Sequence, residues 1–504
     1  MAINWQFVYQ PNGELPPLAW VARIHGHVVE CDCGTSVRTE STGFFEGTWV
    51  GPSALESALD ATAPFGTGII SRGAELYAIP PGNTMALLYS WRNGDELLVA
   101  NTLVGLLAKA GLELLPEVDY QGLFARTAHG LLATPTELPT SGGPVEYHLF
   151  ENLHVLPGGQ IEIAPKPREA PFRSFADYVG RLDAAVNSAF ANAPGYKPVM
   201  ALSSGYDSPA VATLAARHGC RHALTFRESR SPAFGGDADD SGEQIGRTLG
   251  MSVELFERTE YMTNDDLPEA EFMASGYTGE EVPYVAMEQA LRHSMMVTGD
   301  LGGWTWLRSD ELDPHPHLSR KDFSACSVTE FRLRLDYIDM PIPMLGMTQV
   351  ASIAAVANSP EMRPYSVGGY YDKPIPRRML EEAGFARGSF AATKRASTAL
   401  IHQQGAALMA PASVISLVEF AAAEGREVDL SPRRRPSRVD RGLMRLLRTM
   451  HMRPLAAPFE AHQRSIVRHR SDTGNLLFRW GVANIRSRYD VLRPRPLTVE
   501  RLRD

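Results

Sequence analysis

The chain has 504 residues, more than one compact core usually holds, so we expect two or three domains. Hydrophobic residues make up 44% and charged residues 21%, as in ordinary globular proteins, which argues against a disordered chain. Four cysteines are too few for a disulfide scaffold. We therefore expect reduced thiols and a cytoplasmic location. The first nine residues are of mixed character, so we expect no secretory signal.

The first 165 residues predict a domain rich in β-strands. Apolar and polar residues alternate, as in half-buried strands, over 19–24, 75–79 and 96–100. A helix is expected over 101–111. The proline-rich segment 165–171 then predicts a stiff linker, so the first domain is expected to span residues 1–168.

The most informative segment is Val199–Pro209, in which an apolar strand runs into a Ser/Gly turn. Pro209 suits the first position of a helix and Ser208 suits the N-cap, so a helix is expected to begin there. Small residues let backbone N–H groups approach an anion closely, and a helix N-terminus adds partial positive charge. The turn therefore predicts a phosphate cradle, although it lacks the lysine of a Walker-type loop.

Strands and helices alternate after this turn. We expect strands over 222–226, 252–256 and 295–298, helices over 209–218, 243–249 and 282–293, and a Gly/Asp-rich loop over 235–240. This alternation predicts a parallel sheet covered on both faces. Ligands of such sheets bind beyond the carboxyl ends of the strands, where the turns 203–208, 225–226 and 298–300 all fall.

The turn 203–208 resembles the pyrophosphate loop S-G-G-x-D-S of the superfamily of asparagine synthetases, β-lactam synthetases and lasso-peptide cyclases. Five of the six positions match, and Ser204 replaces a glycine. The resemblance implies ATP and Mg²⁺ as cofactors, with Asp207 and Asp300 as metal ligands. It implies that ATP is bound by Leu202, Ser203, Ser204, Gly205, Tyr206, Asp207, Ser208, Thr225, Phe226, Glu243 and Gly299. Gly303 and Trp304 stand where the superfamily has an acidic pair.

The N-terminal region resembles the amidotransferase half that precedes the synthetase half in asparagine synthetases, and its segment 156–159 is similar to the L-P-P-G turn that closes that half. Such glutaminases carry a cysteine directly after the initiator methionine, whereas Ala2 stands here, so we expect no glutamine hydrolysis. The implied fold is α/β. A degenerate αββα glutaminase-like domain of the N-terminal-nucleophile (Ntn) type is followed by a parallel-sheet ATP pyrophosphatase domain over 169–410, of the adenine nucleotide α-hydrolase type.

Later residues match positions that carry the second chemical step in this superfamily. The segment 332–344 resembles E-x-R-x-P-F-x-D, which puts Asp339 where a base takes a proton from the attacking amine, with Tyr337 as the alternative base. The segment 371–378 resembles the D-K-x-x-x-R start of a late helix. A further stretch is similar to the one that ends in the catalytic lysine, here Lys394, whose charge would stabilise the tetrahedral intermediate.

The last part of the chain is basic although the whole chain has a net charge of −9. From residue 431 on there are 18 arginines, no lysine and 6 acidic residues. We expect a mostly helical extension over 411–504 that packs on the acidic body or docks an acidic partner, and no binding of nucleic acid. The apolar stretch 406–423 contains Pro411 and Glu419, and predicts a core helix instead of a membrane span.

The resemblance thus implies an ATP-dependent carbon–nitrogen ligase that acts through an acyl-adenylate and releases AMP and pyrophosphate. The expected substrate is a carboxylate-bearing small molecule or peptide, closed to a lactam or a lasso-peptide macrolactam in a natural-product pathway. A peptide-processing or leader-binding protein is a candidate partner. Two alternatives stay open: an ammonia-using enzyme that makes a primary amide, and a catalytically silent nucleotide-binding scaffold.

Overall fold

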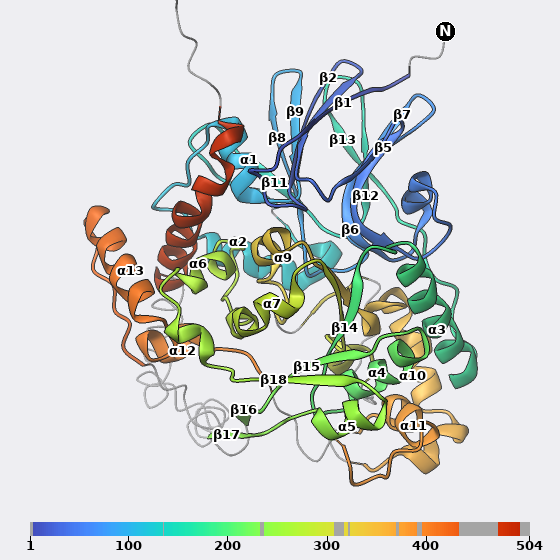
Figure 1. The fold of residues 1–504 in the computed structure, drawn as a ribbon. Coiled ribbons are helices and arrows are strands. Elements are labelled where there is room, and N and C mark those ends of the chain that lie inside the picture. The colour runs from blue at the N-terminus through green and yellow to red at the C-terminus, as the bar shows by residue number, and fades with distance from the viewer. Residues whose placement is uncertain are drawn as a thin grey trace, which may run out of the picture.

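A computed structural model describes residues 4–134, 136–231, 236–306, 317–320, 323–368, 372–390, 396–432 and 472–493. Within these ranges the chain is a mixed α/β protein with one parallel sheet and several largely antiparallel sheets. The strands of the N-terminal region lie together at the top of Figure 1, and the strands of the parallel sheet lie below them.

The N-terminal region forms two sheets that pack face to face. The first has the order β1 (Gln6–Pro11), β3 (Val28–Cys33), β2 (Trp20–His25), β9 (Glu96–Ala100), β8 (Leu88–Asn93), β11 (Val145–His148) and β10 (Glu137–Leu138). The second has the order β13 (Ile161–Ala164), β12 (Asn152–Val155), β7 (Glu75–Ile79), β6 (Pro64–Arg72), β5 (Gly43–Trp49) and β4 (Arg38–Glu40). Apolar side chains of both sheets, such as Trp20 and Phe44, share one core. The predicted strands 75–79 and 96–100 are confirmed as β7 and β9, and the one over 19–24 is β2.

Helix α1 (Leu103–Ala110) covers the other face of the seven-stranded sheet. Thr102 caps the helix by accepting a hydrogen bond from the Gly105 N–H, and Gly111 ends it at a φ of 66°, which glycine adopts without strain. Val104 and Leu107 pack with apolar residues of the sheet. The predicted helix over 101–111 is confirmed with slightly shorter bounds.

Five parallel strands form the sheet that carries the candidate site. Their order is β18 (Ser252–Phe256), β15 (His222–Phe226), β14 (Lys197–Ala201), β19 (Ser294–Thr298) and β20 (Ile338–Pro341). Alternate side chains enter two cores, with Val199 in one and Met200 in the other, so both faces are buried as predicted. The strand order reverses between β14 and β19, and such a switch point is where open parallel sheets bind ligands.

Several expectations for the connecting segments are corrected. The expected loop 235–240 contains β17 (Gly236–Asp239), which pairs with β16 (Glu228–Ser231). Asp240 joins the two strand ends opposite the turn of this hairpin. Its backbone N–H donates to the Arg227 carbonyl, and its carboxylate accepts from Ser229 Oγ. The expected helix 282–293 is a 3-10 helix, η4 (Val282–Met287), followed by the short α7 (Glu288–Leu291). Helices α4 (Asp207–Arg217) and α5 (Glu243–Thr248) lie close to their expected positions.

The described part of the C-terminal extension packs on the body of the protein. A helix over residues 472–485 buries Phe478 and Trp480, and the 3-10 helix η9 (Arg486–Leu492) lies against α1. Arginines of this part form ion pairs with glutamates of other segments: Arg479 with Glu424, Arg486 with Glu113, and Arg488 with Glu271. Arg486 and Arg488 thus pair with glutamates of the preceding regions, as predicted, whereas the Arg479–Glu424 pair lies within the extension.

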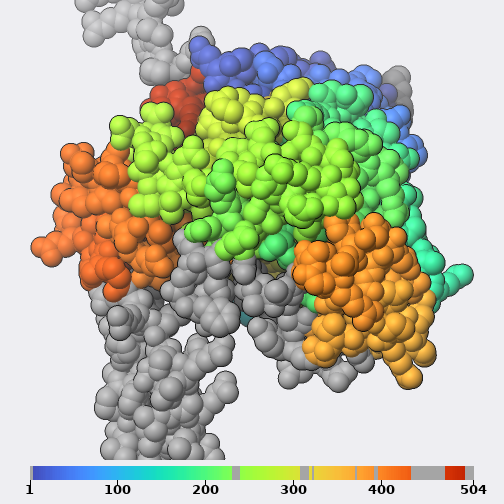
Figure 2. Space-filling model, turned by 60° about the horizontal axis from the view of Figure 1, so that its bottom comes forward, coloured from blue at the N-terminus to red at the C-terminus, as the bar shows by residue number. Residues whose placement is uncertain are grey.

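The expected core helix over 406–423 is only half right. The chain forms a short 3-10 helix, η8 (Gly405–Leu408), and then α13 (Pro411–Ala423), which buries Leu417 but leaves Ile415 60% exposed. Among the described helices, none is by itself long and apolar enough to cross a membrane; one pair, Ile401–Leu408 with Pro411–Ala423, reaches that length only across a bend of 111°. Figure 2 shows α13 and α11 (Pro374–Glu382), both orange, on opposite sides of the green residues of the parallel-sheet region.

A buried ion pair joins the N-terminal sheets to the parallel-sheet region. Arg332 of α9 (Thr329–Leu335) donates from both terminal nitrogens to the carboxylate of Glu46 in β5, at 2.8 Å each. The Glu46 side chain is fully buried and the Arg332 side chain is 8% exposed. Thr67 also donates to Glu46, at 2.9 Å. Because a bidentate pair is geometrically specific, it fixes α9 relative to β5.

We expect Arg332→Met to lower the free energy of unfolding by about 3–5 kcal/mol, because it leaves the Glu46 charge buried without its partner. The double variant Glu46→Gln/Arg332→Met should recover a large part of this loss. Arg72→Met, which breaks the exposed pair with Asp60, is the control and should change stability by less than about 1 kcal/mol. Urea unfolding measures all three, and an effect of Arg332→Met as small as that of the control would contradict the assignment.

Candidate functional site

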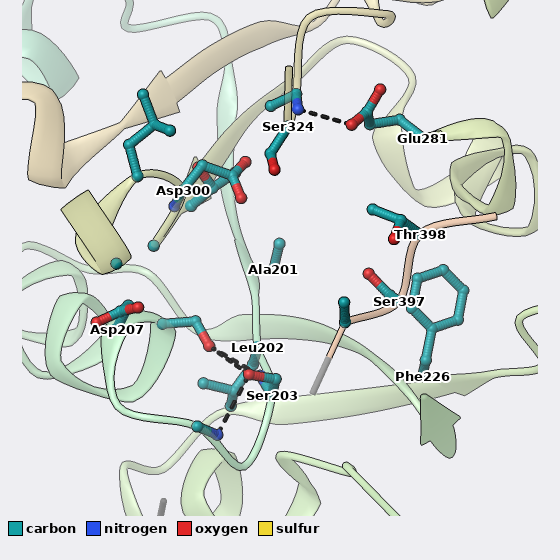
Figure 3. Close-up of a pocket in the computed structure, with 18 of the residues that line it drawn as sticks. Ala201, Leu202, Ser203, Asp207, Phe226, Glu281, Asp300, Ser324, Ser397 and Thr398 are labelled. Atoms are coloured by element: carbon teal, nitrogen blue, oxygen red, sulfur yellow. Dashed lines mark hydrogen bonds between the residues drawn. The ribbon is translucent and has the colours of Figure 1, made fainter. Parts of the chain in front are cut away.

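A cavity of about 540 Å³ opens at the carboxyl ends of β14, β15 and β19. Residues that the sequence predicted for nucleotide or metal binding line it: Leu202, Ser203, Gly205, Tyr206, Asp207, Ser208, Phe226, Gly299 and Asp300. Figure 3 shows Ser203 and Asp207 at one end of this cavity and Glu281 and Ser324 at the other. The structure thus brings together most of the predicted ATP site.

The turn after β14 is held in shape by its own hydroxyl groups. Ser208 Oγ accepts a hydrogen bond from the Ser203 backbone N–H and contacts Ser203 Oγ, both at 3.0 Å. The Gly205 N–H points to Ser203 Oγ at 3.3 Å. These contacts close a tight turn directly before α4, whose first N–H groups have no partner within the helix. Such N–H groups are suited to bind an anion.

The expected helix start at Ser208 and Pro209 is corrected by these contacts. Helix α4 begins at Asp207, its N-terminus has no side-chain cap, and Ser208 lies inside the first turn. The Ser208 hydroxyl reaches back across the turn to Ser203 instead of capping the helix. Serine does favour the N-cap position, but in this tight turn the Ser208 hydroxyl accepts a hydrogen bond from Ser203 instead.

Ser204, which replaces a glycine of the superfamily's loop, is accommodated because its side chain turns to Asp240 and does not line the cavity. Its hydroxyl donates to Asp240 Oδ1 at 2.8 Å, and its backbone N–H donates to the Asp240 carbonyl at 2.9 Å. The side chain is therefore turned toward the β16–β17 hairpin and leaves the cavity open. The substitution costs the cradle no space.

The loop after β19 closes the cradle because two of its residues are glycines. A Cβ atom at Gly302 would lie 2.6 Å from Asp207 Cγ, and one at Gly299 would overlap the backbone of Asp207 and Ser208. Real Cβ atoms do not approach backbone so closely. The two loops can therefore meet at the switch point only while positions 299 and 302 lack side chains.

Lys373 is the main residue of this site that the sequence prediction omitted. Its ammonium group donates to both carboxylate oxygens of Asp207, at 2.7 and 2.6 Å, and the residue is only 1% exposed. Lys373 directly precedes α11, and Arg377 of that helix donates to the Tyr206 hydroxyl. The resemblance of 371–378 to a D-K-x-x-x-R segment was the signal that pointed to this lysine.

The remaining predicted nucleotide-binding residues have different positions. Phe226 lines the cavity, and its ring lies nearly parallel to that of Tyr284, with centroids 6.4 Å apart. Thr225 instead anchors α5, because its Oγ1 accepts from the Gly242 N–H at 2.9 Å. Glu243 begins α5 and pairs with Arg247. Thr225 and Glu243 thus support the site from outside the cavity.

The predicted catalytic residues lie behind the cavity or outside the described residues. Asp339, on β20, lines a neighbouring small cavity of about 30 Å³, and Ala325 lines both cavities. Tyr337 is fully buried and lines neither of them. Lys394 lies outside the described residues, but Ser397 and Thr398, which follow it closely, line the main cavity.

Burial and like charges raise the pKa values of the acidic groups near the cavity wall at Ala325. The pKa of Asp339 is raised from 3.8 to about 8, mainly by burial and then by the charge of Asp300. Burial also raises the pKa of Glu281 to about 8, and Glu280 and Asp300 add to the shift. The phenol of Tyr337 has its pKa raised well above 10 by burial, which makes Asp339 the better base of the two.

Glu281 is a second residue that sequence reasoning missed. Its carboxylate accepts hydrogen bonds from the backbone N–H groups of Ala325, at 2.6 Å, and Ser327, at 3.3 Å. It thereby fixes the loop that forms the far wall of the cavity (Figure 3). No sequence motif marked it, because its partners lie more than forty positions away.

No protein-family model matches the sequence, and no similar curated protein is found. The functional argument therefore depends on the geometry of the site itself.

Gly299→Ala should lower the free energy of unfolding by about 1–3 kcal/mol, because its methyl group would overlap backbone atoms that cannot move aside. The matched control is Gly180→Ala, in the middle of α3 (Phe175–Ala191), where an added Cβ meets nothing within 4 Å. That control should be neutral or stabilise the protein by up to about 1 kcal/mol. Equal thermal unfolding midpoints for the two variants would show that the loops do not meet as described.

The raised pKa of Asp339 makes a prediction about stability and pH. Because the folded protein holds this proton more tightly than the unfolded chain, the carboxyl lowers stability progressively as pH rises from about 4 to about 8. Asp339→Asn should therefore stabilise the protein at about pH 9 and have little effect near pH 4. Urea unfolding at both pH values measures this difference, with the exposed Asp95→Asn as the control. A pH-independent effect of Asp339→Asn would contradict it.

Proposed function

We propose that the protein is an ATP-dependent carbon–nitrogen ligase of the superfamily that its 203–208 turn resembles. The observation that carries the proposal is the closed turn Ser203–Ser208 beside Lys373, at the switch point of the parallel sheet. The first N–H groups of α4, which have no partner within the helix, and the Lys373 ammonium lie together there, as binding of a triphosphate requires. A cavity of about 540 Å³ is in the usual size range for a site of this kind.

The finer fold assignment is part of the same proposal. The two packed N-terminal sheets agree with a glutaminase-like domain of the Ntn type, and the five-stranded parallel sheet agrees with an ATP pyrophosphatase domain. In this assignment the N-terminal domain serves as a scaffold. Its buried Glu46 supports this role, because it holds α9, the helix that leads into β20 and Asp339.

The donor set near the cradle also fits a magnesium ion bound together with phosphate. Within the described ranges, no three His, Cys, Asp or Glu side chains are grouped to hold a metal ion alone. Mg²⁺ commonly uses one or two carboxylates and takes its other ligands from phosphates and water. Asp207 and Asp300 would be those carboxylates, and the ion would neutralise charge on the phosphates.

The proposed reaction has two steps. A substrate carboxylate oxygen attacks the α-phosphorus of ATP, the bond to the β-phosphate oxygen breaks, and pyrophosphate leaves at the Ser203–Ser208 turn beside Lys373. An amine nitrogen then attacks the acyl carbon, AMP leaves, and the amine proton passes to the carboxylate of Asp339. The raised pKa, about 8, makes the ionised Asp339 carboxylate a strong base for that proton, and the ionised fraction grows as pH rises above neutral. Lys394 is the proposed second cation.

A silent nucleotide-binding scaffold is the second candidate function. The Asp207–Lys373 ion pair favours it, because Lys373 already neutralises the carboxylate that the metal would use. In this alternative ATP binds to the cradle, but no substrate carboxylate is activated. Pyrophosphate release separates the two candidates.

Lys373→Met should weaken ATP binding about tenfold or more and reduce pyrophosphate release about 10²-fold, because it removes the cation beside the departing phosphates. Isothermal titration with ATP and Mg²⁺ gives the affinity, and release is assayed against a panel of small carboxylic acids and peptides. Lys197→Met is the matched control, since Lys197 is an exposed lysine at the opposite end of β14.

The proposal fails if a crystal soaked with a non-hydrolysable ATP analogue holds the triphosphate elsewhere. Binding of ATP at the turn without pyrophosphate release, for any acid of the panel, favours the silent scaffold. Product mass identifies the amine source, because cyclisation loses one water whereas amidation by ammonia changes the mass by about one unit.

A further inference from the structure

A second cavity lies between α1 and the C-terminal extension, apart from the candidate site. Its volume is about 590 Å³, and the two cavities share no described residue. Helix α1, helix α13 and the helix over residues 472–485 all contribute side chains to its wall. In Figure 1 the last of these helices, drawn in red, lies beside the other two. Three distant parts of the sequence therefore enclose this space.

Arg479 is a charged residue in an otherwise apolar run of the helix over 472–485. Leu477, Phe478 and Trp480 around it are at most 2% exposed, and Arg479 itself is 4% exposed. A buried guanidinium destabilises the fold unless acceptors reach its nitrogens. Its Nη1 donates to Glu424, whereas Nε and Nη2 have no hydrogen-bond partner among the described residues. These two nitrogens form one edge of the guanidinium plane, the fork that can hold a carboxylate by two parallel hydrogen bonds.

Arg486, one turn of helix and a half further on, adds another unsatisfied donor. Its Nη1 donates to Glu113 at 2.6 Å and its Nη2 to the Leu112 carbonyl at 3.1 Å, but its Nε has no partner among the described residues. Three guanidinium nitrogens of the lining residues are thus unpartnered, against one acceptor oxygen, Oε2 of Glu424. An ionised carboxylate only accepts hydrogen bonds, so it matches this excess of donors.

The charges at the cavity also suit a single negative group. Three arginines and two glutamates line it: Arg479, Arg486, Arg493, Glu113 and Glu424. Arg493 pairs with Asp490 at 2.8 Å, but both side chains are about half exposed, so solvent screens that pair. The lining itself therefore carries one positive charge in excess.

We propose that this second cavity binds a small organic acid, whose carboxylate accepts hydrogen bonds from the Nε and Nη2 edge of Arg479. Its apolar part lies against Leu107 of α1, Phe420 of α13 and Val482 of the C-terminal helix. An inorganic anion would leave that apolar wall in contact with water, so the wall favours an organic ligand. The proposal is independent of the ligase function, because the two cavities have no residue in common.

Isothermal titration of sodium hexanoate into the full chain, at constant ionic strength and without nucleotide, tests the proposal. Hexanoate should bind, whereas acetate, which lacks the chain, and n-hexanol, which lacks the charge, should bind at least about tenfold more weakly. Inorganic phosphate should also bind at least about tenfold more weakly. Affinity for phosphate or n-hexanol equal to that for hexanoate would overturn the assignment to an organic acid.

Variants locate the site. Arg479→Lys keeps the positive charge but loses the two-nitrogen edge, so it should weaken hexanoate binding about tenfold. The matched control is Arg72→Lys, because Arg72 also donates from two nitrogens to a carboxylate, that of Asp60, but does not line the cavity. This control should leave the affinity unchanged.

Arg486→Gln is the second site variant and should also weaken hexanoate binding, which keeps the test decisive if Arg479→Lys does not fold. Circular dichroism shows which variants are folded. Unchanged affinity for hexanoate in the folded site variants, or an equal loss in Arg72→Lys, would overturn the proposal.

Discussion

The whole candidate site depends on one constraint, the parallel pairing of β14 with β19. The carboxyl ends of the two strands emerge side by side, so the loops that follow them must share the space beyond the sheet. They can share it because Gly299 and Gly302 have no side chains where they meet Ser208 and Asp207. The turn 203–208 is therefore shaped from both sides, and α4 starts at its edge with N–H groups that have no partner within the helix.

A second set of contacts makes the N-terminal sheets and the C-terminal extension part of the same assembly. Helix α9 is bound by Glu46 of β5 through Arg332. Its Glu330 accepts hydrogen bonds from Thr102 at 2.5 Å and from Tyr489 of the C-terminal extension at 2.6 Å. Three distant parts of the chain thus hold the helix that leads into β20. These contacts fix the position at which β20, and with it Asp339, begins.

Much of this arrangement follows from local sequence patterns, and the rest does not for identifiable reasons. Strand β15 has the predicted bounds because its apolar run reports burial directly. Strand β18 also has the predicted bounds, although its residues are polar and apolar and partly exposed at the edge of the sheet. The turn 203–208 could be predicted because its small residues are consecutive in the sequence and therefore form a local pattern. Lys373 meets Asp207 across 166 positions and Glu281 meets Ala325 across 44, so no local pattern could have paired them. Ser208 was misplaced as an N-cap because its partner was set by the turn.

The two ends of the main cavity differ in their charged groups, and this difference would orient a charged ligand in the cavity. At the cradle, Lys373 offsets the charge of Asp207, so the partial positive charge at the N-terminus of α4 is left to face an anion. At the far end, Glu280 and Glu281 line the wall, and burial raises the pKa of Glu281 to about 8, so this wall becomes more negative as pH rises above neutral. In the proposed function a triphosphate would therefore lie at the cradle, and Asp300 would lie between it and this wall. A substrate carboxylate beside the α-phosphorus would then be held between the cradle and the wall at Ala325, where both proposed displacements at its acyl carbon would take place.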